Sequence, residues 1–471
     1  MILQNIRALL GGAGLILCLF ATNASAQGLI SLSWFQPTTL DSSAAWMVSA
    51  QGQYTYFPPA ASLEAGDTLQ WRVQVPVSGY YDVSLTLGPL QASWGLRAEV
   101  MLDNRVLGVV YNPPQTLEPV ESDLGRLRLE AGQYLLRVRN PYRPVGEFGS
   151  LTFSPTDVPF ALPRSTFCTV QDWHLDPPLP IGAHLYAGGN YNAYLSPADT
   201  LLGAHQTLES LASLSPDFLV GNGDLVHWGS VESLSTFADL MSSLPLPWFV
   251  TMGHHETKTI DRATIKQAWK PGLPRAATYY GLDLNGTRYL FLDSAYFQGP
   301  DGRFYRTPPA RWTGKVGLCA EEWPWLRGVL LDNQRHYNLP VVVFTHHTII
   351  PYRLPLPPPV ARRLDDYKTM PPADAPELLA LLNADPNVKA IFSGHAHFQM
   401  AITSGHILHM QGAATGEGAM TYLRGLVFDD HLEVETYQAV DQSFLQESYA
   451  PLHTGDWVVG YPEDINCSIG F

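Results

Sequence analysis

From about residue 163 onward, short apolar segments alternate with amphipathic segments of helical length. The apolar segments read STFCTV, DFLVGN, PWFVTM, RYLFLDS, PVVVFT and VKAIFS. The spacing of Leu and Ala between them predicts helices at 197–214, 231–243, 320–334 and 375–384. Strands that are apolar at nearly every position belong to sheets covered on both faces. We therefore predict an α/β domain, of the broader α+β type, over residues 163–445.

The preceding part of the chain, residues 27–158, has a period of two. Segments such as LQWRVQV, YDVSLTL and YLLRVR alternate apolar and polar residues, with no amphipathic segment of helical length between them. This pattern predicts an all-β sandwich. The order of the strands also resembles galactose-binding-like sandwiches, which include carbohydrate-binding modules. A carbohydrate ligand would need exposed aromatic rings, for which Trp94 and Tyr142 are candidates. A structural or targeting role is the alternative that we favour.

The first 26 residues have the pattern of a secretory signal peptide. Arg7 supplies the positive charge, a short apolar run follows, and Ala24-Ser25-Ala26 offers small residues for cleavage. The apolar run is too short to span a bilayer comfortably, so a retained anchor is the less favoured alternative. No later segment has the long apolar run of a membrane helix. We expect a secreted or periplasmic protein with no membrane span after signal removal.

The net charge limits which partners the protein can bind, and the cysteine content limits which disulfides it can form. The chain has 28 Lys and Arg against 43 Asp and Glu, a net charge of −15. This acidic balance disfavours non-specific nucleic-acid binding, so no nucleic-acid surface is expected. Beyond the leader an odd number of cysteines remains, which allows at most one internal disulfide. We expect Cys319 to pair with Cys467, Cys168 to be a buried small residue, and 446–471 to form a C-terminal tail.

Aspartates and histidines follow the apolar segments of the second half within a few positions. They occur in VQDWHLD, VGNGDLVHWG, VTMGHHET, VVVFTHH and IFSGHAHF. Since the carboxyl ends of strands in an open α/β sheet share one edge, these side chains are expected to converge. Imidazole and carboxylate bind borderline divalent metals such as Fe, Mn, Zn or Co. One such histidine alone is usually structural. The whole set is explained economically by two metal ions that share an aspartate.

In this order, the five segments resemble the motifs D-x-H, G-D, G-N-H-(E/D), H and G-H-x-H of the calcineurin-like metallophosphoesterases. The resemblance implies two packed mixed sheets with flanking helices and a dimetal site at one edge. It implies a first metal held by Asp172, His174, Asp224 and His397. It implies that Asp224 bridges to a second metal, held also by residue 254, His346 and His395.

Residue 254 departs from this family, which has asparagine there. Asn Oδ1 and His Nδ1 are the same number of bonds from Cα, so we predict that His254 binds the second metal through Nδ1. Its Nε2–H would then face the substrate. The rival interpretation is that His254 turns away and leaves the second site weak or empty.

Other strand-end residues are assigned by elimination or by analogy. The usual H-x-P reads His346-His347-Thr348, and we assign the ligand to His346 and place His347 outside the ligand shell. We expect His227 to be structural. A solvated loop is favoured over phosphate binding for Arg353, Arg362 and Arg363.

The resemblance implies a secreted, dimetal-dependent hydrolase that cleaves phosphoesters by attack of a metal-activated hydroxide. His255 would meet the substrate phosphate and protonate or stabilise the leaving oxygen, and Glu256 would hold its ring. The substrate would be a small-molecule or glycan-linked phosphoester, either monoester or diester. One alternative is a secreted carbohydrate-binding protein whose second domain is a silent scaffold. Another is a dimetal hydrolase that acts on non-phosphate bonds.

Overall fold

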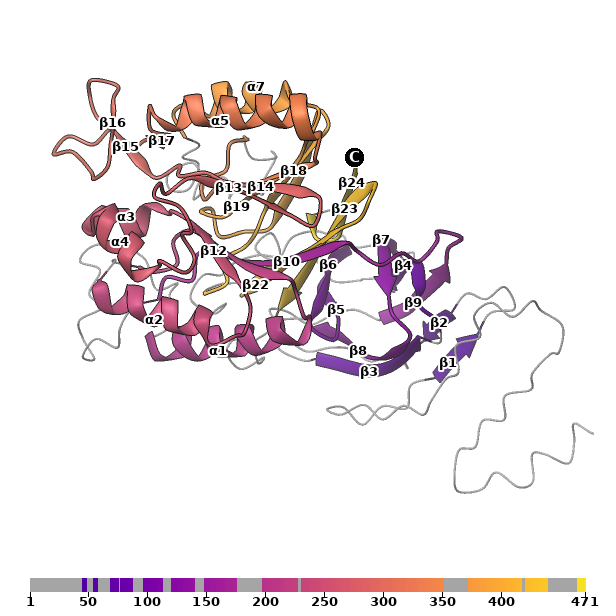
Figure 1. The fold of residues 1–471 in the computed structure, drawn as a ribbon. Helices are drawn as coiled ribbons and strands as arrows, with labels where there is room; N and C mark the ends of the chain where they lie inside the picture. Colours follow the sequence, from indigo (N-terminus) through magenta and orange to yellow (C-terminus); the bar gives the residue numbers. More distant parts are fainter. Residues whose placement is uncertain are drawn as a thin grey trace, which may run out of the picture.

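The structure is a computed structural model, and it combines a strand-rich N-terminal part with a larger part in which helices flank two sheets (Figure 1). The residues that it describes are 45–48, 54–57, 68–75, 77–87, 96–112, 120–139, 148–175, 197–227, 230–350, 372–416, 420–438 and 464–471. Several predictions fall outside these residues, namely the signal peptide at 1–26, Trp94, Tyr142, Arg353, Arg362 and Arg363.

The N-terminal part is a sandwich of two antiparallel layers, as the alternating pattern predicts. One layer has the order β1 (Ala45–Val48), β2 (Tyr54–Phe57), β9 (Phe148–Pro155), β4 (Gly79–Leu87) and β7 (Val120–Leu129). The other has β6 (Arg105–Asn112), β5 (Leu96–Leu102), β8 (Gly132–Arg139) and β3 (Thr68–Val75). Alternate residues such as Val83, Leu85, Val100 and Val138 are buried. The period of two thus separates core from solvent.

The second part contains two mixed sheets. The first has the order β12 (Trp248–Thr251), β11 (Phe218–Asn222), β10 (Ser165–Val170), β22 (Thr421–Val427) and β23 (His431–Gln438). The second has β13 (Tyr280–Leu284), β14 (Thr287–Phe291), β18 (Val341–Phe344), β19 (Val388–Ser393), β21 (Ile407–Gln411) and β20 (Met400–Ser404). Strands β10, β11 and β12 are parallel, as are β14, β18, β19 and β21. Their carboxyl ends therefore share an edge within each sheet.

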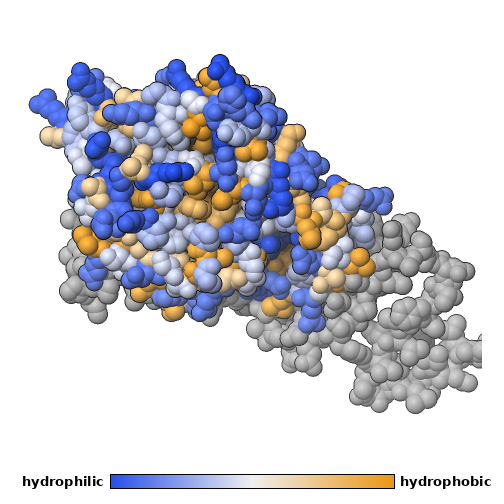
Figure 2. Space-filling view, viewed as in Figure 1, coloured by the Kyte–Doolittle hydropathy of each residue, from blue (hydrophilic) through white to orange (hydrophobic). Residues whose placement is uncertain are grey.

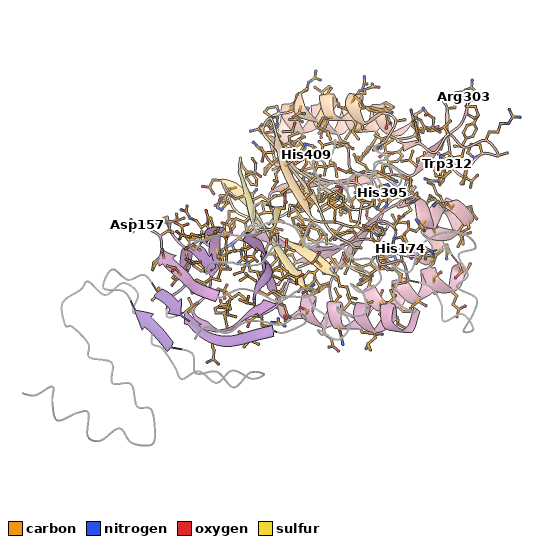
Figure 3. The ribbon with its side chains drawn as sticks, turned by 180° about the vertical axis from the view of Figure 1, so that it is seen from behind. Asp157, His174, Arg303, Trp312, His395 and His409 are labelled. Carbon is orange, nitrogen blue, oxygen red and sulfur yellow. The ribbon has the colours of Figure 1, made fainter. Side chains whose placement is uncertain are left out.

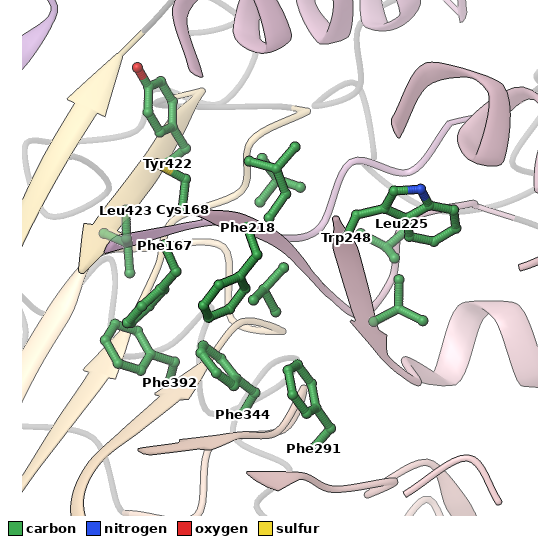
Figure 4. Close-up of a cluster of buried hydrophobic side chains, with 14 of the residues drawn as sticks. Phe167, Cys168, Phe218, Leu225, Trp248, Phe291, Phe344, Phe392, Tyr422 and Leu423 are labelled. Carbon is green, nitrogen blue, oxygen red and sulfur yellow. The ribbon is translucent and has the colours of Figure 1, made fainter. Parts of the chain in front are cut away.

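Phenylalanine rings fill the space between the two sheets. Phe167 of the first sheet meets Phe344 and Phe392 of the second edge-on, with ring centroids 5.3 and 5.2 Å apart (Figure 4). All three are fully buried. Burial of one such side chain stabilises the fold by about 2–3 kcal/mol. The aromatic layer therefore fixes the two sheets, and with them their strand ends, against each other.

Helices cover the outer face of each sheet (Figure 1). The first sheet is covered by α1 (Pro197–Ser213) and α2 (Val231–Ser242), the second by α5 (Glu322–Asp332) and α7 (Ala375–Asn383). These confirm the four predicted helices, and a π-helical turn, η1 (Asn333–Tyr337), continues α5. The sequence patterns missed α3 (His254–Thr259), α4 (Arg262–Ala268) and a small sheet of β15 (Tyr296–Gln298), β16 (Phe304–Tyr305) and β17 (Val316–Gly317).

One continuous sheet joins the two parts of the chain. Strand β23 pairs antiparallel with β6 through Tyr437 and Arg105, so the first sheet and one sandwich layer form a single ten-stranded sheet. At the other end of β23, β24 (Cys467–Gly470) pairs along residues 431–434. The last residues of the expected C-terminal tail thus belong to this sheet.

The expected disulfide between Cys319 and Cys467 is wrong. Both cysteines are free, as is Cys168, which is buried as expected. Cys319 lies in the segment between β17 and α5. Cys467 is the first residue of β24, which pairs with β23 of the ten-stranded sheet. The two thiols therefore belong to different layers of the fold.

On the face shown in Figure 2, hydrophilic residues predominate and apolar residues are interspersed among them. Within the described part of the chain, no helix has both the length and the apolar character needed to cross a membrane.

Candidate metal centre

The strand-end residues singled out in the sequence come together in the structure. Asp172 and His174 follow β10, Asp224 follows β11, His254 and His255 begin α3 after β12, His346 and His347 follow β18, and His395 and His397 follow β19. His174 and His395 are labelled in Figure 3. Apart from His255 and His397, whose side chains are 13 % and 10 % exposed, these side chains are nearly inaccessible to solvent. Two packed sheets thus deliver one cluster of imidazoles and carboxylates.

Many of these residues have a left-handed backbone. The φ angles are 51° at Asp172, 50° at His174, 49° at Asp224, 74° at His395 and 62° at His397. For a residue that has a β-carbon, the left-handed conformation is less stable than the usual right-handed or extended one by roughly 1 kcal/mol or more. Such strain persists where the surrounding structure enforces it, and it concentrates at functional sites. The left-handed residue turns the chain sharply as it leaves each strand.

Two glycines leave room for the two carboxylates. A β-carbon on Gly253 would lie 2.2 Å from Oδ1 of Asp224 and 2.1 Å from its backbone nitrogen. A β-carbon on Gly394 would lie 2.6 Å from Oδ2 of Asp172. Real β-carbons do not approach other atoms so closely, so any larger residue would displace the carboxylate.

Asp172, His174 and His397 form the first group of candidate ligands. Nε2 of His174 lies 3.2 Å from Nε2 of His397, which in turn lies 3.3 Å from Oδ1 of Asp172. The carboxylate of Asp172 also accepts the backbone N–H of His395 at 2.9 Å. Burial, followed by the nearby His255, lowers the pKa of His174 well below its usual range, so its ring is neutral. A neutral imidazole presents a lone pair, as a metal ligand must.

The second group surrounds Asp224. Its Oδ2 lies 3.1 Å from Nδ1 of His254 and 3.1 Å from Nε2 of His346. These three atoms are buried and lack a hydrogen-bond partner among the described residues, and so do both ring nitrogens of His395. The predicted atom of His254, Nδ1, is thus the one that faces Asp224.

The ring of His346 is oriented by a backbone carbonyl on the side away from Asp224. Its Nδ1 lies 3.0 Å from the backbone oxygen of Asn222, and because a carbonyl only accepts, Nδ1 carries the hydrogen and Nε2 points at Asp224. Burial acts to lower the pKa of His346, but the carboxylates of Asp224, Asp172 and Glu256 together outweigh it and raise that pKa to about 9. A cation that bound at Nε2 would therefore release a proton.

These features fit divalent cations. Asp224 lies between the groups, because its ligand atoms fall within 4.8 Å of those of His254 and His255 and also of those of Asp172 and His346. Carboxylate and imidazole suit Fe, Mn or Zn. Buried polar atoms that face each other without hydrogen bonds are costly unless a ligand satisfies them.

His255 is oriented by a backbone carbonyl. Its Nδ1 lies 2.7 Å from the oxygen of His227, so Nδ1 carries the hydrogen. Its Nε2 lies 4.0 Å from Oδ2 of Asp224, whereas Nδ1 of His254 lies 3.1 Å from the same oxygen. The ring of His227 meets that of His174 with 3.2 Å between their Nδ1 atoms. His227, expected to be structural, therefore supports two residues of the site.

The prediction that Glu256 holds the ring of His255 is wrong. The Glu256 carboxylate is fully buried and accepts backbone N–H groups from Gly253 at 2.8 Å, Asp224 at 3.2 Å, Val226 at 3.3 Å and Leu225. A buried carboxylate needs several donors, and the turn after β11 supplies them. Glu256 therefore fixes the backbone of Asp224 instead of the ring of His255.

His347 lies closer to the site than the sequence suggested. Its ligand atom falls within 4.8 Å of those of His254, His346 and His395. Position after a strand indicates that such a residue is near the edge, but it does not say which way each of two adjacent histidines turns.

Comparison with known proteins gives one match to a family model, and it covers the residues of this site. Residues 172–399 match the family model of the calcineurin-like phosphoesterases. This span contains every candidate ligand described above. No curated protein matches the chain.

The solved structures that this chain matches are distant from it in sequence. A dimetal phosphatase from Danio rerio is 15 % identical, with a TM-score of 0.47 over 59 % of this chain and 98 % of that one. A purple acid phosphatase from yellow lupin (Lupinus luteus) seeds is 12 % identical, with a TM-score of 0.39 over 84 % of this chain and 79 % of that one. A family 35 carbohydrate binding module from an environmental isolate is 12 % identical, with a TM-score of 0.19 over 27 % of this chain and all, 100 %, of that one.

Proposed function

We propose that this protein is a metal-dependent hydrolase of phosphoesters, because residues 172–399 match the family model of the calcineurin-like phosphoesterases. The observation that carries the proposal is the meeting of Asp224 Oδ2 with His254 Nδ1 and His346 Nε2, three buried atoms without hydrogen bonds among the described residues. Leaving a buried polar atom unsatisfied costs about 1–3 kcal/mol. Charge attraction between His346 and Asp224 offsets part of this cost, and divalent cations at these atoms would offset the rest.

Two divalent cations would be held by the two groups of side chains. Asp172, His174 and His397 would hold the first, His254, His346 and His395 the second, and Asp224 both. When bound, the cations would supply positive charge that stabilises the phosphoryl oxygens and lowers the pKa of water. Fe, Mn and Zn all suit this donor set.

The chain's own residues would orient the substrate and move protons. With Nδ1–H of His255 held by the carbonyl of His227, proton exchange with the leaving oxygen is confined to Nε2. With Nδ1 of His254 turned to Asp224, its Nε2–H is left as a donor to the substrate. The adjacent histidines of α3 would thus divide metal binding and proton transfer between them.

We further propose that the substrate is met outside the cytoplasm, as a small-molecule or glycan-linked phosphoester. The signal-peptide pattern of residues 1–26 supports export. A carbohydrate ligand of the sandwich is consistent with its strand order. A glycan-binding screen of the full chain would test that ligand separately from the hydrolase.

The test is the initial rate of the full chain, reconstituted with Mn²⁺, on an aryl phosphate monoester and on its matched diester. Metal-dependent turnover of either substrate supports the proposal, and their ratio distinguishes phosphatase from phosphodiesterase. An absence of turnover with Mn²⁺, Zn²⁺ and Fe²⁺ would overturn it. In that case a carbohydrate-binding protein with a silent scaffold becomes the better interpretation.

Asp224→Ala tests the shared position. Because its carboxylate lies between both groups, we expect the variant to lose both metals and turnover. Asp301→Ala, at an exposed aspartate, is the matched control and should keep both. Retention of two metals per chain by Asp224→Ala, measured by elemental analysis, would contradict the shared role.

A further inference from the structure

The geometry points to His347 as an additional ligand of the second cation, so that four imidazoles and Asp224 form that site. This inference deepens the proposed function and rests on it. The rings of His254, His346, His347 and His395 lie around one point, with centroids between 4.6 and 5.7 Å apart. One nitrogen of each lies within 4.8 Å of the others.

His347 is held from the side that faces away from this group. Its Nδ1 lies 2.9 Å from Oγ of Ser294, and the same oxygen accepts the backbone N–H of His347 at 3.2 Å. Ser294 is fully buried just after β14. A hydroxyl that holds one ring nitrogen fixes the direction of the other, as outer partners do for metal-binding histidines.

The remaining nitrogen of His347 faces the cluster. Nε2 is buried and lacks a hydrogen-bond partner among the described residues. A bound cation would give this buried nitrogen a partner, whereas a purely structural role would leave it without one.

The extra imidazole also alters which metals the site prefers. Neutral nitrogen donors add no negative charge, and they favour Zn²⁺ over Mn²⁺, which prefers carboxylate and water. The first group, with Asp172 and only two imidazoles besides Asp224, lacks this bias. The two positions should therefore differ in their preference for Zn²⁺.

The experiment is calorimetric titration of the metal-free full chain with Zn²⁺ alone and with Mn²⁺ alone. For His347→Ala we expect Zn²⁺ binding at one site to weaken about tenfold or more, with the other site unchanged. Ser294→Ala should weaken the same site less, because it releases the ring without removing it. His336→Ala, at an exposed histidine, is the control for loss of an imidazole and should match the wild type.

The outcomes separate this inference from the proposed function. If His347→Ala binds Zn²⁺ with wild-type affinity, the ligand role is overturned. If its KM for the substrate rises at the same time, His347 is a substrate contact instead. A wild-type chain that binds neither metal would instead refute the proposed function. If His347→Ala does not fold, as judged by circular dichroism, His347→Gln keeps most of the side-chain volume and takes its place, with the same expectation.

Discussion

At the scale of single residues, the neighbours His254 and His255 differ in their distance from the shared carboxylate. Nδ1 of His254 lies 3.1 Å from Asp224 Oδ2, whereas Nε2 of His255 lies 4.0 Å from it. We expect His255→Ala to lower kcat by roughly 10²–10⁴-fold, as for other acid–base groups, while both metals stay bound. Steady-state kinetics together with elemental analysis checks this. His205→Ala, on the exposed face of α1, is the control, and metal loss in His255→Ala would reassign His255 as a ligand.

Glu256 acts on the site through the backbone. In Glu256→Gln an amide NH₂ would face backbone N–H groups that now donate to a carboxylate oxygen. We expect the free energy of unfolding to fall by about 1–3 kcal/mol, and metal affinity to fall with it. Urea denaturation of the metal-free protein measures the first effect. Glu209→Gln, exposed on α1, should change stability by less than about 0.5 kcal/mol. Equal stability of the two variants would contradict the anchoring role.

At the scale of elements, the start of α7 is sensitive to pH. Asp374 occupies the position before α7, its Oδ2 accepts the backbone N–H of Leu318 at 2.9 Å, and burial raises its pKa to about 6. Because the unfolded pKa is lower, the native state holds this proton more tightly, and the resulting stability is lost as pH rises towards about 6.

Asp374→Asn should remove this pH dependence, since the side-chain carbonyl can still accept the N–H of Leu318. The stability of the wild type relative to the variant should fall by about 2 kcal/mol between pH 4 and pH 7. Urea denaturation of both proteins across this range measures the difference. A constant difference would show that Asp374 does not titrate in this window.

The elements also show what sequence patterns reveal and what they miss. Helices such as α1 and α2 were predicted because Leu and Ala recur at helical spacing over many residues. By contrast, α3 has 6 residues and α4 has 7, too few for a 3.6-residue period to emerge. Position after a strand located every candidate ligand. It did not reveal that Glu256 turns to the backbone or that His347 turns to the cluster, because those directions depend on contacts between distant segments.

At the scale of the whole molecule, the sandwich and the second part of the chain share one continuous ten-stranded sheet. Where β6 meets β23, Nη1 of Arg105 lies 2.8 Å from Oε1 of Glu435, with side-chain exposures of 8 % and 3 %. Arg424 lies 3.4 Å from the other oxygen of Glu435. The hydrophobic patterns of the sequence located both parts of the chain. They could not show that β6 pairs with β23, because pairing between strands far apart in the sequence leaves no local signal.

Glu435→Gln should destabilise the molecule by about 3–5 kcal/mol, because it leaves the buried guanidinium of Arg105 and the partly buried one of Arg424 without their carboxylate. Differential scanning calorimetry should show one transition for the wild type and a lower melting temperature for the variant. Glu377→Gln, which removes the exposed 2.8 Å pair with Arg327, should cost less than about 1 kcal/mol. Separate transitions of the two parts in the wild type would show that the shared sheet does not couple them.

The spread of the ligands along the chain governs when the centre can form during synthesis. His395 donates its backbone N–H to Asp172 across 223 residues of sequence. A ribosome adds those residues in about 10 to 45 seconds. Throughout that interval the first carboxylate has been made but its last partners have not. The proposed metal centre could therefore be completed only late in biogenesis, since a chain halted before β19 would carry most of the candidate ligands and no complete site.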